Sequence, residues 1–113
     1  MNRKQLKEIL NELKNELKIS EPIKIELKPM KTKAASISLR KNTIRINKNI
    51  IPNLDLECIE YLLLHELIHF KLKSKYHNGK FHGQLSKKIS KTKAKQLERK
   101  ILNALLKINN ILF

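Results

Sequence analysis

Two histidines and a glutamate in the middle of the chain have the types and the spacing of a metal site. Residues 65–69 read HELIH. If this segment is helical, His65 and His69 lie one turn apart on one face, where two imidazoles can bind the same zinc ion. Glu66 lies about 100° around the helix from His65, so its carboxylate can act as a base toward water without binding the metal. The pattern predicts zinc-assisted hydrolytic chemistry.

A zinc ion that activates water keeps one coordination position open, so a third protein ligand is expected. Downstream residues that could supply it are His77, His82 and Glu98. We favour His77, because the Asn78-Gly79 pair can form a turn that brings the chain back toward the helix. His82 and then Glu98 remain the alternatives.

The N-terminal half of the chain shows the periodicities of one helix and three strands. Apolar residues recur with a helical period over residues 3–17. They alternate with polar residues over 23–27, 35–39 and 43–46, as in strands with one buried face. A turn at 40–42 joins the last two segments, so we expect these two strands to form a hairpin.

The HELIH segment lies in the most apolar stretch of the chain. Residues 55–73 are apolar on most sides, which predicts a helix deep in the core, capped by Asn53 or Asp55. A shorter helix is expected over about Asn78–Ile89. After a polar stretch, Ser86–Lys95, a last helix is expected to run to Phe113.

Length and composition exclude several classes of protein. The 113 residues, of which 41% are hydrophobic, fit one globular domain spanning residues 1–113. The first ten residues lack the apolar stretch of a signal peptide, and the apolar C-terminus is too short to span a bilayer. Cys58 is the single cysteine, so no internal disulfide can form. A reducing compartment fits, and we expect a cytoplasmic protein.

The net charge is +15, and residues 67–113 hold twelve basic residues against one acid. Such an excess attracts polyanions. However, lysine outnumbers arginine 21 to 4, and aromatic residues make up only 4% of the chain. Lysine does not read base edges in the bidentate manner of arginine, and few aromatics are available for base stacking. Nucleic acid is therefore a possible partner that we do not favour.

Residues 62–81, LLLHELIHFKLKSKYHNGKF, carry a family resemblance. They resemble the small gluzincin-like metallopeptidases called minigluzincins and, more distantly, the YgjP-like and SprT-like domains. The shared pattern is HExxH, a short variable stretch and then His-x-x-x-Phe, here His77 to Phe81. The chain length and the order of helix, strands and HExxH helix also match, and an archaeal member of the family is similar over nearly the whole chain.

The resemblance implies a fold, an activity and a set of roles. The fold is a minimal zincin-like α+β fold with an N-terminal helix, a small three-stranded sheet, the HExxH helix and C-terminal helices. The activity is that of a zinc metalloendopeptidase acting on peptides or proteins. Zinc would be held by His65, His69 and His77, and Glu66 would move the proton. In zincin folds the strand that precedes such a hairpin turn borders the active-site cleft and pairs with extended substrate.

Three small residues precede the expected hairpin turn on that strand. Ala34, Ala35 and Ser36 would let a substrate backbone approach, as in recognition by strand addition. The plain alternative is an ordinary exposed edge strand. Tyr61 lies one turn before His65 on the same face, where packing is the favoured role and support of the metal site the alternative.

The last segment, residues 96–113, carries a broad apolar stripe that must be buried somewhere. The resemblance implies latency, with C-terminal segments covering the cleft. The hypothesis is a zymogen-like enzyme whose last helix exchanges between two chains across a hinge at Ser86–Lys95, giving a homodimer. Glu98 or Asn103 would then approach the metal. The alternative is a plain core helix in a monomer.

Two other functions compete with a latent peptidase. One is a SprT-like protease that acts on DNA-bound proteins, which predicts salt-dependent DNA binding. The other is a basic, non-catalytic module with a structural metal, which predicts metal binding without cleavage.

Overall fold

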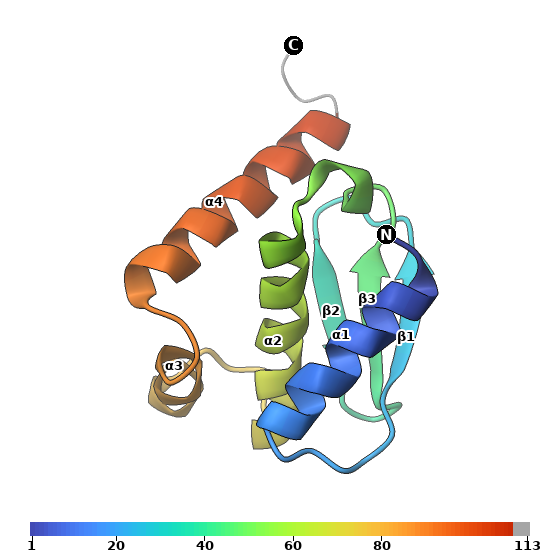
Figure 1. The fold of residues 1–113 in the computed structure, drawn as a ribbon. Helices are drawn as coiled ribbons and strands as arrows, with labels where there is room; N and C mark the ends of the chain where they lie inside the picture. The colour runs from blue at the N-terminus through green and yellow to red at the C-terminus, as the bar shows by residue number, and fades with distance from the viewer. Residues whose placement is uncertain (110–113) are drawn as a thin grey trace.

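The computed structural model describes residues 1–109, where helices pack on one face of a small mixed sheet (Figure 1). This is the α+β fold that the sequence predicted. The elements in chain order are α1 (Arg3–Glu16), β1 (Lys24–Lys28), β2 (Ala35–Ser38), β3 (Thr43–Asn47), the short 3₁₀ turn η1 (Ile51–Asn53), α2 (Leu56–Leu72), α3 (Gly79–Ser86) and α4 (Lys91–Ile108).

The three strands form a sheet in the order β1-β3-β2. β2 and β3 pair antiparallel as the expected hairpin, and Asn42 at the turn adopts a left-handed backbone with φ of 49°. β1 pairs parallel with β3, which places β1 and β2 at opposite edges of the sheet. The alternation of apolar residues predicted the strands but not this parallel pairing.

Helix α2 is the centre of the core, and it contacts α1, α3, α4 and β2 (Figure 1). Its burial on most sides agrees with its apolar sequence. The Asp55 side chain caps the helix by accepting a hydrogen bond of 2.9 Å from the Cys58 N–H. The helix ends at Lys73, whose left-handed backbone has φ of 51°. This stop redirects the chain back along the helix.

Asn47 fixes the loop that leads into β2. Its side chain is fully buried, and its Nδ2 donates hydrogen bonds to the carbonyls of Met30 at 2.7 Å and Lys33 at 3.1 Å. Its Oδ1 accepts from the Asn49 N–H at 3.0 Å. A buried amide with satisfied donors and acceptor holds a loop that has no regular structure of its own. The start of β2 is therefore held in place from within.

The last two helices differ from the sequence-based expectation. α3 ends at Ser86 rather than at Ile89, and α4 begins at Lys91 because the Ser90 side chain accepts a hydrogen bond from the Lys93 N–H. Much of the expected hinge, Ser86–Lys95, is thus helical, and only residues 87–90 connect the two helices. The expected helix end at Phe113 lies outside the described residues.

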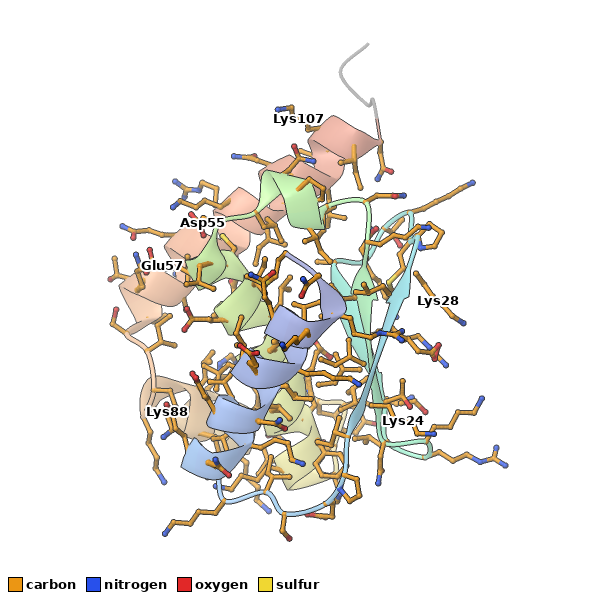
Figure 2. All side chains as sticks on the ribbon, turned by 45° about the vertical axis from the view of Figure 1, so that its right-hand side comes forward. Lys24, Lys28, Asp55, Glu57, Lys88 and Lys107 are labelled. Atoms are coloured by element: carbon orange, nitrogen blue, oxygen red, sulfur yellow. The ribbon has the colours of Figure 1, made fainter. Side chains whose placement is uncertain are left out.

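Helix α4 packs on the α2 helix of its own chain. Its apolar stripe begins one turn earlier than expected and buries Ala94, Leu97, Ile101 and Ala104. Two ion pairs join it to the start of α2, one from Lys93 to Glu57 at 3.0 Å and one from Lys100 to Asp55 at 3.2 Å. Asp55 and Glu57 lie on that side in Figure 2.

Basic side chains extend outward over much of the surface, as Lys24, Lys28, Lys88 and Lys107 illustrate in Figure 2. Within residues 1–109 no helix combines the length and the apolar composition needed to cross a membrane.

We expect an Asp55→Ala variant to lose about 1 kcal/mol of unfolding free energy at pH 7, the usual cost of losing an N-cap. The hydrogen bond from the Cys58 backbone holds the pKa of Asp55 below its ordinary value. The ionised carboxylate therefore stabilises the fold above its unfolded pKa, and this contribution disappears as the pH falls through the lowered folded pKa. Urea unfolding of both chains at neutral and acidic pH measures the difference.

The matched control is Asp55→Asn, because asparagine keeps a capping oxygen but has no charge to titrate. This variant should lose less stability than the alanine variant. A difference between wild type and Asp55→Ala that stays unchanged at acidic pH would contradict a role for the ionised carboxylate.

Candidate metal centre

Three histidine side chains converge beside α2. The Nε2 atom of His77 lies 3.1 Å from Nε2 of His69 and 3.2 Å from Nε2 of His65. His65 and His69 are one turn apart on α2, as their spacing predicted. His77 comes from the segment after the helix. The structure thus brings together the two histidines of the HELIH segment and the downstream histidine that we favoured.

The approach of His77 depends on the turn after α2 and on one aromatic ring. The chain reverses at the left-handed Lys73, and Asn78 then caps α3 by accepting from the Lys80 and Phe81 N–H groups. Gly79 lies inside α3 without a positive φ, so the expected Asn78-Gly79 turn is wrong in its detail. Phe81 is 1% exposed, and its ring centroid lies 4.6–4.9 Å from those of the three imidazoles.

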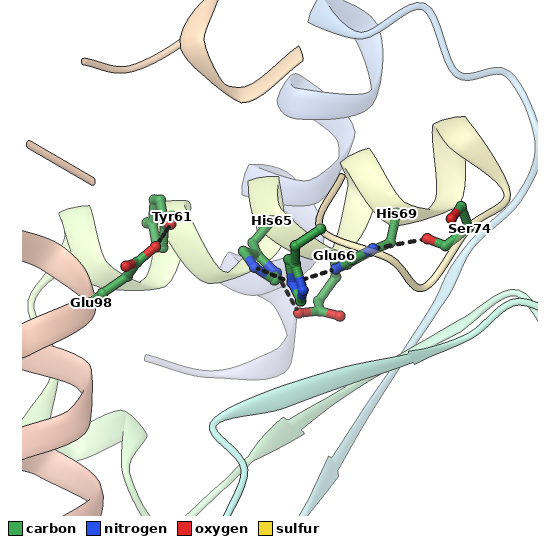
Figure 3. Close-up of polar contacts among 7 residues, drawn as sticks. Tyr61, His65, Glu66, His69, Ser74 and Glu98 are labelled. Atoms are coloured by element: carbon green, nitrogen blue, oxygen red, sulfur yellow. Dashed lines mark hydrogen bonds and ion pairs between the residues drawn. The ribbon is translucent and has the colours of Figure 1, made fainter. Parts of the chain in front are cut away.

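The hydrogen bonds of the rings leave their Nε2 lone pairs available. The Ser74 carbonyl can only accept, so Nδ1 of His69, at 2.8 Å, donates to it (Figure 3). Nδ1 of His65 donates to the Glu66 carboxylate at 3.1 Å. In both rings Nε2 is then the unprotonated nitrogen, and a partner on Nδ1 is the usual arrangement of metal-binding histidines.

The site fits a metal ion in both geometry and charge. Ligands at tetrahedral zinc, with Zn–N of about 2.0–2.1 Å, lie about 3.3 Å apart, close to the two separations between Nε2 of His77 and the Nε2 atoms of His65 and His69. Burial lowers the pKa of His77 below its ordinary value, and the neighbouring His65 and His69 lower it further. A lowered pKa favours the neutral imidazole, which is the form that binds metals.

Glu66 lies beside the three rings but does not belong to the cluster that could bind a metal. It is 6% exposed, and Figure 3 shows its carboxylate directed toward the same space as the rings of His65 and His69. A carboxylate in this position can take a proton from a water molecule in the cleft.

A cleft of about 500 Å³ opens over the histidines. One wall is the β2 side, where Ala34, Ala35 and Ser36 line the cleft. β2 is an edge strand. Among the described strands it pairs with β3 alone, so its other edge is not paired with a strand. The opposite wall is α4, whose lining residues are Glu98, Ile101, Leu102 and Leu105.

A hydrogen bond between Tyr61 and Glu98 joins the two helices at the edge of the cleft (Figure 3). Tyr61 is 3% exposed, and burial together with the Glu98 carboxylate raises its pKa, so the phenol stays protonated and donates. Tyr61 packs as expected, but it also binds a residue of α4. This contact holds α4 against the metal-site helix.

The other expected site residues lie apart from the three histidines. His82 lies on α3, where its ring contacts Phe81 at a centroid distance of 5.7 Å. Glu98 binds Tyr61 and is not in the cluster of three. Asn103 lines a separate cavity with Asp55 and Lys100, so within one chain it does not border the metal cleft. The Ser74 carbonyl could not be predicted from the sequence, because a backbone group carries no signal in a side-chain pattern.

The fold and the site together define a metallopeptidase of the minimal zincin-like type. The model of the YgjP-like metallopeptidase domain family matches residues 2–103, and the chain belongs to this family. The family resemblance seen in the HExxH and His-x-x-x-Phe pattern is thereby confirmed.

Two solved structures share the fold over most of its length. The crystal structure of the metallopeptidase zymogen of Methanocaldococcus jannaschii jannalysin is 46% identical in sequence, covers 88% of this chain and 96% of its own, and has a TM-score of 0.81. The metallopeptidase zymogen of Pyrococcus abyssi abylysin is 30% identical, covers 87% of this chain and 92% of its own, and has a TM-score of 0.80.

Similar sequences occur in archaea and in a bacterium. A Methanocaldococcus jannaschii protein, itself uncharacterised, is 46% identical over 105 residues, which are 93% of this chain and 96% of the relative. An uncharacterised Aquifex aeolicus protein is 42% identical over 83 residues, which are 74% of each chain.

Replacing His77 with Ala should abolish tight metal binding, because two imidazoles remain where three converge. Removing a group that only hydrogen-bonds a metal ligand lowers metal affinity by about 10–100-fold. Because His77 would itself be a ligand, we expect its removal to lower metal affinity by more than about 100-fold. Zinc titration by calorimetry, with metal content after dialysis, measures it. The matched control is His82→Ala, which removes a nearby imidazole outside the cluster. Full zinc occupancy in the His77→Ala chain would exclude His77 as a ligand.

Proposed function

We propose that this chain is a zinc-dependent endopeptidase that is held in a latent form by its C-terminal helix. The main support is the convergence of three imidazole Nε2 atoms beside a buried carboxylate in a cleft bordered by an edge strand. Three nitrogen ligands in tetrahedral positions suit zinc, and the fourth position stays open for reaction. His65, His69 and His77 hold the ion in this proposal.

The protein's own residues supply proton transfer and orientation. When bound, zinc contributes a Lewis acid that polarises the scissile carbonyl and the attacking water. Glu66 accepts the proton of that water and delivers it to the leaving amine. Its hydrogen bond with Nδ1 of His65 fixes the carboxylate, and the Ser74 carbonyl fixes the ring of His69.

The edge of β2 offers a binding mode for an extended peptide. The Asn47 N–H donates to the Ala34 carbonyl at 2.9 Å, which sets the alternation of hydrogen bonds along the hairpin. In an antiparallel pair of strands, the backbone N–H and C=O groups of successive residues point alternately toward the partner strand and away from it. The backbone groups of Ser36 therefore face β3, while those of Ala35 and Ile37 face the free edge. A substrate strand can pair there.

Helix α4 is the element that supports latency. It forms one wall of the metal cleft, and Leu102 is 54% exposed on that wall. The two solved structures described above are both those of metallopeptidase zymogens. We further propose that α4 exchanges between two copies through residues 87–90, giving a homodimer in which Glu98 or Asn103 reaches the partner's metal. A cytoplasmic location stays a prediction that rests on the single cysteine.

To test latency, we expect the double variant Glu98→Ala/Leu102→Ala to cleave a fluorogenic peptide at least several-fold faster than wild type. The first change removes the hydrogen bond to Tyr61, and the second opens the cleft wall at an exposed position where little packing is lost. Truncation after Lys95 is less suitable, because it would uncover the face of α2 that Leu97 and Ile101 bury.

Gln96→Ala is the matched control, since Gln96 is exposed on α4 and does not line the metal cleft. Light scattering over a dilution series reports the oligomeric state, and a helix-exchanged dimer should gain activity per chain on dilution. A wild-type monomer as active as the double variant would contradict latency.

For the chemistry, Glu66→Gln should keep the fold and the zinc content but lower kcat by about 10²–10⁴-fold, the typical contribution of a general base. The change is made in wild type and in the double variant, so that a blocked cleft does not hide the effect. Mass spectrometry of the products shows whether the cut is internal, as an endopeptidase requires. Glu60→Gln, at an exposed position of the same helix, is the control. Equal activity with and without the Glu66 carboxylate would exclude it as the base.

A further inference from the structure

Two lysines line opposite ends of the metal cleft. Lys33 lies two residues before the start of β2, and Lys75 lies three residues after the end of α2. β2 and α2 contact each other and run in the same sense, as Figure 1 shows. The start of β2 therefore lies near the start of α2, and the residues after α2 lie at the other end. His65 lies between the two lysines, which both are exposed.

The two lysines are not neutralised by the acids of the cleft. Among residues 1–109 neither Lys33 nor Lys75 takes part in an ion pair. The carboxylates that line the cleft are those of Glu66 and Glu98. The Glu66 carboxylate is hydrogen-bonded to His65 near the middle of the cleft, and the Glu98 carboxylate is hydrogen-bonded to Tyr61 at the α4 wall. The ends of the cleft thus present positive charge.

We propose that Lys33 and Lys75 determine specificity, so that the cleft selects peptides with acidic side chains on both sides of the bond that is cut. The inference rests on the proposed peptidase function and adds the chemical class of its substrate. A peptide paired along the free edge of β2 is extended, with about 3.3 Å per residue, and its two halves run toward the two lysines. The net charge of +15 also steers acidic peptides toward the protein.

The expected size of the preference follows from the exposure of both lysines. An exposed ion pair is weak, and a contribution near the middle of its usual range corresponds to about a threefold change in affinity. Two such pairs at separate ends act almost independently, so together they give about a tenfold preference. Added salt should reduce this preference, because exposed charges are screened.

The test measures binding by fluorescence anisotropy to the full-length, zinc-loaded Glu66→Gln chain, which binds peptides without cutting them. The same measurement is made with Glu98→Ala/Leu102→Ala added, so that a closed cleft does not mask binding. Four labelled peptides share an apolar centre and differ only in their flanks: glutamate in both halves, in the N-terminal half, in the C-terminal half, or glutamine throughout. We expect the doubly acidic peptide to bind about tenfold more tightly than the glutamine peptide.

Single substitutions assign each end of the cleft. Lys33→Gln should remove the gain from glutamate in one half of the peptide only, and Lys75→Gln the gain from the other half. Lys24→Gln is the matched control, because it removes the same charge from β1 at the opposite edge of the sheet (Figure 2). This control should keep the full preference.

Two results would overturn the inference and leave the peptidase standing. One is equal binding of the glutamate and glutamine peptides, and the other is a loss in Lys24→Gln as large as that in the cleft variants. Absence of binding by all four peptides, with α4 substituted or not, would overturn the proposed function together with this inference.

Discussion

The site depends on one contact, the packing of the Phe81 ring against all three imidazoles. His65 and His69 are held by α2 itself, but His77 lies in a short connection without regular structure. Phe81, buried at the start of α3, fastens that connection to the core, and its ring contacts each histidine ring. The three Nε2 atoms converge because the apolar side chain of Phe81, four residues after His77, is buried in the core.

In the short connection between α2 and α3, a few residues satisfy the hydrogen bonds of the backbone groups at both helix ends. The left-handed Lys73 ends α2, and this turn brings the Ser74 carbonyl to Nδ1 of His69. One backbone group thus serves both as part of the helix stop and as the partner that orients a ring. Asn78 then starts α3 by binding the Phe81 N–H. The segment between the two helices is short, and its ends are both capped.

Local sequence signals predicted much of this, since each depends on neighbouring residues. The HELIH spacing placed His65 and His69 on one helix face, and the alternation of apolar residues predicted the hairpin. The sequence favours His77 through an Asn-Gly turn, whereas the chain reverses direction at Lys73. A lysine in a left-handed conformation has no signature in the sequence. The parallel pairing of β1 and the buried role of Asn47 depend on residues far apart in the chain, which periodicity does not report.

Helix α4 has two faces with different tasks, and this limits how the cleft could open. One face buries Leu97 and Ile101 against α2, and the neighbouring face places Leu102 on the wall of the cleft. Simple detachment would expose the apolar face together with the part of α2 that it covers, at a cost of several buried side chains. An exchange of α4 between two copies avoids this cost, because each core regains an identical helix. Exchange therefore keeps both cores packed and restores the same cleft wall, so a change at the exposed Leu102 face opens the cleft with less loss of packing than release of the whole helix.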